Sequence, residues 1–222
     1  MTDPQPLQHQ AGKPRIFLVG FNKCGTTSFH DFFRANGIAS VHWRANTLAM
    51  TMHRHWLSGH RPLLDDLEQW TAYTDLICLP GSPWGRSNSD DQPVIEACGY
   101  FRELHRDYPD ALFVLNTRDP FDWIRSRLQH DQGRFAAAYL AAVAAEGITD
   151  EAQLCRRWLR DWYAHHSAVL EYFHSVAPEQ LLVFDLKHTP QQELMRFLHP
   201  HFELPSPVLP HHHRTDEPQA AP

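Results

Sequence analysis

The feature that most constrains this chain is a strand, a tight loop and a helix in immediate succession near its N-terminus. Residues 16–19 (IFLV) form a short apolar run of the kind found in buried strands. A small, hydroxyl-rich turn follows over residues 20–28. Three phenylalanines in residues 29–33 then recur at helical spacing, and Gly37 stands where a helix C-cap glycine belongs. Backbone N–H groups and the helix dipole favour an anion at such a helix N-terminus, so the stretch predicts a phosphate or sulfate site.

The residues of this loop, GFNKCGTTS, indicate which anion it binds. Gly20 and Gly25 have the spacing of a nucleotide P-loop, G-x-x-x-x-G-K-[ST], but Thr26 occupies the lysine position. The cation is Lys23, inside the loop, which gives the pattern K-x-G-T-T-S. Taken alone, the loop leaves open a plain strand-to-helix turn with an exposed lysine.

A second stretch carries the same kind of chemistry. Residues 111–116 (ALFVLN) form another buried-strand run, and Arg118 follows it. Ser126 lies eight residues further on, in the amphipathic segment 121–129. A guanidinium offers a rigid fork to phosphate oxygens and a hydroxyl adds a neutral donor, so this pair also suits an anion.

The two motifs together resemble the PAPS-dependent sulfotransferases, particularly compact bacterial members, over about residues 14–214. The resemblance implies transfer of a sulfuryl group from 3′-phosphoadenosine 5′-phosphosulfate (PAPS) to a hydroxyl or amine, with release of PAP and without a divalent metal. It implies that Lys23 contacts the leaving phosphate and that Arg118 and Ser126 hold the 3′-phosphate. The residues expected to hold the 5′ end are Asn22, Lys23, Cys24, Gly25, Thr26, Thr27 and Ser28.

An acceptor hydroxyl also needs a general base. Our first candidate is Asp75, inside the predicted strand 72–79, where the resemblance places the catalytic histidine of cytosolic members. An aspartate that caps a loop or pairs with an arginine is the alternative. The second candidate is His42, at the end of the predicted strand 38–43, whereas His30 on the first helix is expected to pack or to face solvent.

The family's third cofactor contact, a basic glycine-containing loop near the C-terminus, is not found. Arg214 is the only basic residue in that vicinity, so the clamp on the adenine and 3′-phosphate stays incompletely assigned. Two alternatives therefore remain, a P-loop kinase and a non-catalytic PAP-binding homologue. The acceptor is a small molecule, carbohydrate or lipid. Aromatic residues that either line its pocket or belong to the surface or core are Trp43, Trp56, Trp84 and Phe101.

Strands alternate with helical segments along the chain, which predicts an α/β fold with a parallel sheet flanked by helices on both faces. With the resemblance, this is a P-loop NTPase-like sulfotransferase fold with ligands at the carboxyl ends of the strands. The loop 80–92 is rich in Gly, Ser and Pro and is expected to move. The remaining predicted elements are helices 45–56, 63–70, 94–106, 133–146, 151–174 and 191–198 and a strand at 181–184.

Composition sets the boundaries of this interpretation. The 222 residues suit one domain, predicted at 14–210 between a disordered lead-in (1–13) and a tail (211–222). The net charge of −6 and the lack of a basic run argue against nucleic-acid binding. No apolar run reaches membrane-span length, and the first residues lack a secretory apolar segment.

The cysteines and histidines indicate no metal site. The four cysteines lack paired spacing, which favours a reduced, cytoplasmic protein, and the 17 histidines show no ligand pattern. Cys24, beside Lys23 at the helix N-terminus, is either a reactive thiol or a small residue in a tight loop. The oligomeric state is not indicated.

Overall fold

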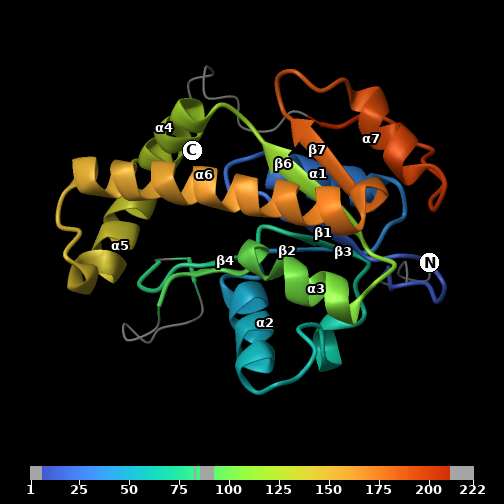
Figure 1. Ribbon diagram of the computed structural model, residues 1–222, viewed down its shortest axis with the longest axis horizontal. Coiled ribbons are helices and arrows are strands. Elements are labelled where there is room, and N and C mark those ends of the chain that lie inside the picture. Colours follow the sequence, from blue (N-terminus) through green and yellow to red (C-terminus); the bar gives the residue numbers. More distant parts are fainter. Residues whose placement is uncertain (1–6, 83, 86–92, 211–222) are drawn as a thin grey trace, which may run out of the picture.

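A computed structural model describes residues 7–82, 84–85 and 93–210 (Figure 1). Its main sheet has five strands in the order β2-β3-β1-β6-β7, and every neighbouring pair is parallel. This confirms the predicted α/β class. The strands are β1 (Ile16–Leu18), β2 (Ser40–His42), β3 (Ala72–Thr74), β6 (Leu112–Thr117) and β7 (Leu181–Asp185).

Helices cover both faces of this sheet, as predicted, and each face has its own apolar core. One core gathers two helices and the other gathers five, among them the long α6 that runs across the sheet in Figure 1. On one face lie α1 (Thr26–Ala35) and α7 (Gln191–Leu198); on the other lie α2 (Thr47–Leu57), α3 (Phe101–Asp107), α4 (Pro120–Gln129), α5 (Arg134–Val143) and α6 (Glu151–Val176).

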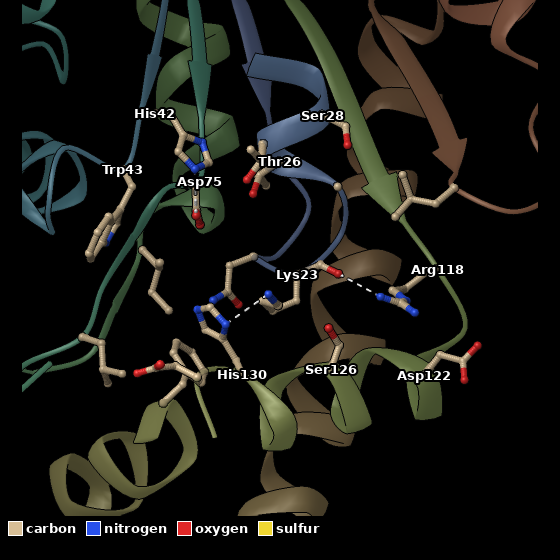
Figure 2. A pocket seen from close by; sticks show the side chains of 18 of the residues that line it. Lys23, Thr26, Ser28, His42, Trp43, Asp75, Arg118, Asp122, Ser126 and His130 are labelled. Atoms are coloured by element: carbon tan, nitrogen blue, oxygen red, sulfur yellow. Dashed lines mark hydrogen bonds and ion pairs between the residues drawn. The ribbon is translucent and has the colours of Figure 1, made fainter. Parts of the chain in front are cut away.

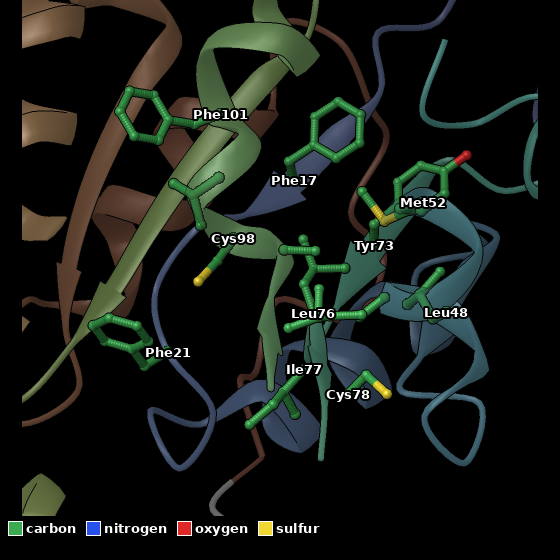
Figure 3. Close-up of a cluster of buried hydrophobic side chains, with 14 of the residues drawn as sticks. Phe17, Phe21, Leu48, Met52, Tyr73, Leu76, Ile77, Cys78, Cys98 and Phe101 are labelled. Atoms are coloured by element: carbon green, nitrogen blue, oxygen red, sulfur yellow. The ribbon is translucent and has the colours of Figure 1, made fainter. Parts of the chain in front are cut away.

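Strand β1 lacks the alternation of polar and apolar residues that a strand with one exposed face would have. Successive side chains of a strand point to opposite faces, and both faces of β1 are covered. Ile16 and Leu18 join the core beneath α1 and α7. Phe17 points the other way and stacks on Tyr73, with ring centroids 5.0 Å apart (Figure 3). Burial on two sides fixes the strand at the centre of the sheet.

Local sequence signals set the ends of the helices. Helix α6 begins with a capping box: Asp150 accepts from the Gln153 amide at 2.7 Å, and the Gln153 side chain accepts from the Asp150 amide. In α4, Asp119 caps the first turn and Pro120 occupies its first position. The cap of α4 matters for function because it starts the helix directly after β6.

Two sequence predictions are wrong between β3 and α3. The predicted strand 72–79 is broken at Asp75, whose φ is 58°, and its second half forms β4 (Ile77–Cys78). The predicted helix 94–106 begins as β5 (Ile95–Glu96), passes through a 3-10 turn and becomes α-helical only at Phe101. The reason is long-range pairing, because β4 and β5 form an antiparallel ladder that overrides the helical pattern.

The predicted helix 63–70 is reduced to one 3-10 turn, Asp65–Leu67. The Tyr73 hydroxyl contacts the carbonyl oxygens of Leu67 and Trp70, both at 2.7 Å, and so ties the turn to β3. Of the predicted loop 80–92, residues 83 and 86–92 lie outside the described residues, as does Arg214. No helix in the described part of the chain is long and apolar enough to cross a membrane.

Candidate functional site

A cleft of about 1020 Å³ lies where the parallel strands end (Figure 2). The loop before α1 forms its centre, the ends of β2 and β3 form one side, and α4 forms the other. This is the edge at which an open parallel sheet binds its ligands. The predicted residues on its wall are Asn22, Lys23, Gly25, Thr26, Thr27, Ser28, His42, Asp75, Arg118 and Ser126.

The loop is held in shape by Asn116, the fully buried side chain near the end of β6. Its Oδ1 accepts from the Gly20 amide at 2.9 Å, and its Nδ2 donates to the Cys24 carbonyl at 2.8 Å. A Cβ atom at Gly20 would lie 1.9 Å from the Asn116 carbonyl oxygen, so only glycine fits there. Asn116 was not singled out from the sequence, although a polar residue ending an apolar run was a usable signal.

Two of the loop residues turn away from the cleft centre. The Asn22 side chain accepts from Arg127 Nε at 2.8 Å, and its carbonyl accepts from Trp123 Nε1 at 2.9 Å. Cys24 is fully buried in the core, and burial raises the pKa of its thiol to about 12. The reactive-thiol alternative for Cys24 is therefore wrong, and the small-residue interpretation holds.

Lys23 lies at the middle of the cleft, with its backbone in the left-handed region at φ 64°. Its ammonium group donates to His130 Nδ1 at 3.2 Å. Burial lowers the pKa of Lys23, and the nearby Asp75 carboxylate opposes that effect. His130 was not predicted from the sequence, because the partners are 107 positions apart and give no local signal.

Arg118 and Ser126 reach the cleft from the segment that follows β6 (Figure 2). Arg118 Nη1 donates to the Lys23 carbonyl at 3.3 Å, so the two predicted anion-binding motifs touch each other. The Arg118 Nε atom is buried and has no hydrogen-bond partner among the described residues. A buried donor of this kind is costly unless a ligand accepts from it.

Two more cations lie beside this pair and were not predicted. Arg125 and Lys187 both line the cleft and both pair with Asp122, at 3.3 Å and 2.6 Å. The hydrogen bond from Lys187 lowers the pKa of the Asp122 carboxyl. Lys187 follows β7, so the sheet brings it to α4 across 65 residues of sequence.

The two general-base candidates stand together on the opposite side of the cleft (Figure 2). His42 Nε2 lies 3.6 Å from Asp75 Oδ2, and His42 Nδ1 lies 2.9 Å from Thr74 Oγ1. The Asp75 Oδ1 atom is buried without a hydrogen-bond partner in the described chain. Among the described residues, the charged side chain within ion-pair distance of Asp75 is His42 and not an arginine.

The backbone of Asp75 lies in the left-handed region, as strained residues at functional sites often do. A non-glycine residue in the left-handed region costs about 1–2 kcal/mol, and such strain concentrates at functional sites. His30 stays behind this pair. It contacts Ser40 Oγ at 2.8 Å, and burial lowers its pKa to about 4, so it packs as expected.

The predicted aromatic residues divide between the cleft and the rest of the molecule. Trp43 and Trp84 line the cleft. Trp56 stacks instead on Tyr100 with ring centroids 5.0 Å apart and is partly exposed, while Phe101 is buried in the core (Figure 3).

Comparison with known protein families identifies this architecture. The family model described as a sulfotransferase domain matches residues 91–217, more than half of the chain. The chain belongs to the sulfotransferase family. Membership supports a transferase that moves a sulfuryl group. A search of curated proteins found no significant match.

The matched part of this sulfotransferase contains Arg118 and Ser126 but begins after the Lys23 loop. The assignment of this loop to the anion site therefore depends on its own geometry. Its contacts with Arg118 and Asn116 join it to the matched part. No group of three or more metal-binding side chains occurs in residues 7–82, 84–85 and 93–210.

Proposed function

We propose that this sulfotransferase takes its sulfuryl group from PAPS and transfers it to a hydroxyl or amine of an acceptor, releasing PAP. The observation that carries the proposal is the pair of adjoining anion-binding features in one cleft. Lys23 and the start of α1 form one, and Arg118, whose Nε has no partner among the described residues, forms the other. A donor with phosphate groups at two positions needs both.

The start of α1 fits the 5′ end of such a donor. The helix has no side-chain cap and no acidic residue in its first turn. Gly25 precedes it with φ 75°, which turns the chain so that successive backbone amides face one side. Together with the Thr26 and Thr27 hydroxyls and the Lys23 ammonium, these amides would hold the phosphate and sulfate oxygens.

The neighbouring wall fits the 3′-phosphate. Arg118 and Ser126 would contact its oxygens directly. Arg125 and Lys187 add positive charge there and share the single carboxylate of Asp122. These two cations supply what the absent basic C-terminal loop of the family would otherwise provide.

The bound donor supplies a sulfuryl group whose bond to the phosphate oxygen breaks, with the electron pair staying on that oxygen. Lys23 would stabilise the negative charge that develops there, because its ammonium is held in a largely buried position by His130. Asp75 would accept the proton of the acceptor hydroxyl with its carboxylate, which is partly exposed on the cleft wall. His42, bonded to Thr74, would hold the Asp75 carboxylate in place from behind.

A calorimetric titration tests the donor proposal. The protein is titrated with PAP and with ATP, each with and without magnesium, alongside Lys23→Ala and Arg118→Ala. We expect PAP to bind without metal and both variants to lose affinity. Arg106→Ala is the matched control, since Arg106 is exposed and pairs with Asp107 on α3. Preference for ATP with magnesium would favour the kinase alternative and contradict the proposal.

A further inference from the structure

We propose that the acceptor is a flat, uncharged aromatic alcohol, held between aromatic side chains at the end of the cleft beyond Lys23. This inference rests on the proposed function and specifies its second substrate. The evidence is the set of aromatic side chains on the two sides of this end and the distribution of charged side chains along the cleft.

The first side is built by a turn that fixes Trp43. Residues 43–46 are all in the left-handed region, with φ of 47°, 51°, 53° and 76°. Such a run is unfavourable for L-residues and persists only where contacts hold it. Here Trp43 Nε1 donates to Asn46 Oδ1 at 2.9 Å, and Asn46 Nδ2 donates to the Leu79 carbonyl at 2.8 Å. The indole on the cleft wall is therefore held rigidly (Figure 2).

The second side is built by Trp84, His130 and Phe135, which all line the cleft. The Trp84 ring lies 6.1 Å from the His130 ring, which lies 5.7 Å from that of Phe135. Gly85 joins the two sides, because a Cβ atom there would be 2.1 Å from Asn46 Nδ2. Trp84 and Gly85 thus lie between the Trp43 turn and His130.

The charges along the cleft are unevenly distributed. The cations Arg118, Arg125 and Lys187 gather on the donor side around Asp122. At the acceptor end the described carboxylates are Asp75 and Asp131, and Asp131 is neutralised by its ion pair with Arg134, whose guanidinium lies over the Trp84 ring at 5.3 Å. Asp75 is the carboxylate that the acceptor hydroxyl would meet, and an anionic acceptor would be repelled there, so an uncharged acceptor is favoured.

The chemistry of the walls distinguishes an aromatic alcohol from a sugar. A sugar presents several hydroxyls that need matching polar groups, whereas Ile77, Leu79 and Phe135 offer apolar surface to the cleft. The Asn46 amide is already bonded to Leu79 and Trp43. A flat ring would stack on the Trp43 indole and leave its single hydroxyl toward Asp75. On transfer, its oxygen bonds to sulfur as the sulfur–phosphate oxygen bond breaks, and its proton passes to Asp75 and then to water.

Binding to the PAP-loaded protein tests this without turnover. The probes are 2-naphthol, 6-hydroxy-2-naphthoate and methyl glucoside, each titrated by calorimetry. We expect 2-naphthol to bind at least about 10-fold more tightly than the other two. Trp43→Ala and Trp84→Ala should each weaken 2-naphthol binding about 10-fold and leave PAP affinity unchanged. Trp56→Ala, the matched control outside the cleft, should change neither.

Equal or tighter binding of the carboxylate or the glucoside would overturn the inference. A loss of 2-naphthol affinity in Trp56→Ala equal to that in Trp43→Ala would also overturn the inference. PAP and 2-naphthol are also titrated separately into the free protein, which separates the two proposals. If PAP binds and 2-naphthol does not, the acceptor inference alone fails; if 2-naphthol binds and PAP does not, the donor proposal fails.

Discussion

Replacing Asn116 by alanine should damage both the stability of the protein and its anion-binding loop. Asn116 is fully buried and bonds both ends of the loop, at the Gly20 amide and at the Cys24 carbonyl. Asn116→Ala leaves these two backbone groups without their partners. Each buried polar group left unsatisfied costs about 1–3 kcal/mol, so the free energy of unfolding should fall by about 2–6 kcal/mol.

The loss should also reach the donor site, because the loop residues 20–24 would no longer be fixed at two points. Ordering one loosened backbone residue costs about 1–2 kcal/mol, so PAP affinity should fall by about 5- to 30-fold for each residue that loosens. Urea unfolding followed by tryptophan fluorescence measures the free energy of unfolding, and calorimetric titration measures the PAP affinity.

Asn36 provides a matched control. It is also buried, and its side chain joins two segments through bonds to Phe32 and Ser206. It lies at the other end of α1, away from the cleft. Asn36→Ala should therefore destabilise the protein to a similar extent but leave PAP affinity unchanged. Asn116→Ala with wild-type stability and wild-type PAP affinity would refute the reasoning.

Three further predictions address single residues. Gly20→Ala forces a Cβ atom against the Asn116 carbonyl oxygen and should cost about 3 kcal/mol in urea unfolding, whereas Gly37→Ala, where only φ is strained, should cost about 1 kcal/mol. Burial lowers the pKa of Lys23 below the ordinary 10.5, so PAP affinity should fall as the pH rises toward that value. Lys23→Arg stays charged and should remove this decline, whereas a pH-independent PAP affinity in the wild type would contradict the prediction. The buried Cys24 thiol, with its pKa raised to about 12, should resist iodoacetamide at pH 8 in the native protein while the more exposed Cys155 reacts, and alkylation of Cys24 first would contradict its burial.

Features of the fold that depend on local patterns could be predicted from the sequence. The apolar runs of β1 and β6 and the periodic stripe of α6 are visible in the chain because each element buries a regular set of side chains. The loop before α1 was also recognisable, since its glycines and hydroxyls are consecutive. These features suffice for the fold class and for the position of the cleft.

Other features depend on which distant segments meet. The two-residue strands β4 and β5 form only because Ile77 pairs with Glu96, and neither has a local signal. The contact of Lys23 with His130 and the clamp at Asn116 likewise depend on the register between β1 and β6. A sequence read in short windows contains no information on these contacts.

The central claim is that Arg118 binds the 3′-phosphate of the donor. A thermodynamic cycle that combines one protein variant with one ligand variant tests this claim most directly. PAP and adenosine 5′-monophosphate, which lacks the 3′-phosphate, are titrated into the wild type and Arg118→Ala. Hydrogen bonds to charged groups contribute about 1.5–3 kcal/mol. The wild type should therefore prefer PAP by more than about 10-fold, and Arg118→Ala should lose most of that preference with little change in affinity for the monophosphate. Equal losses for both ligands, or a wild type that does not distinguish them, would contradict the account.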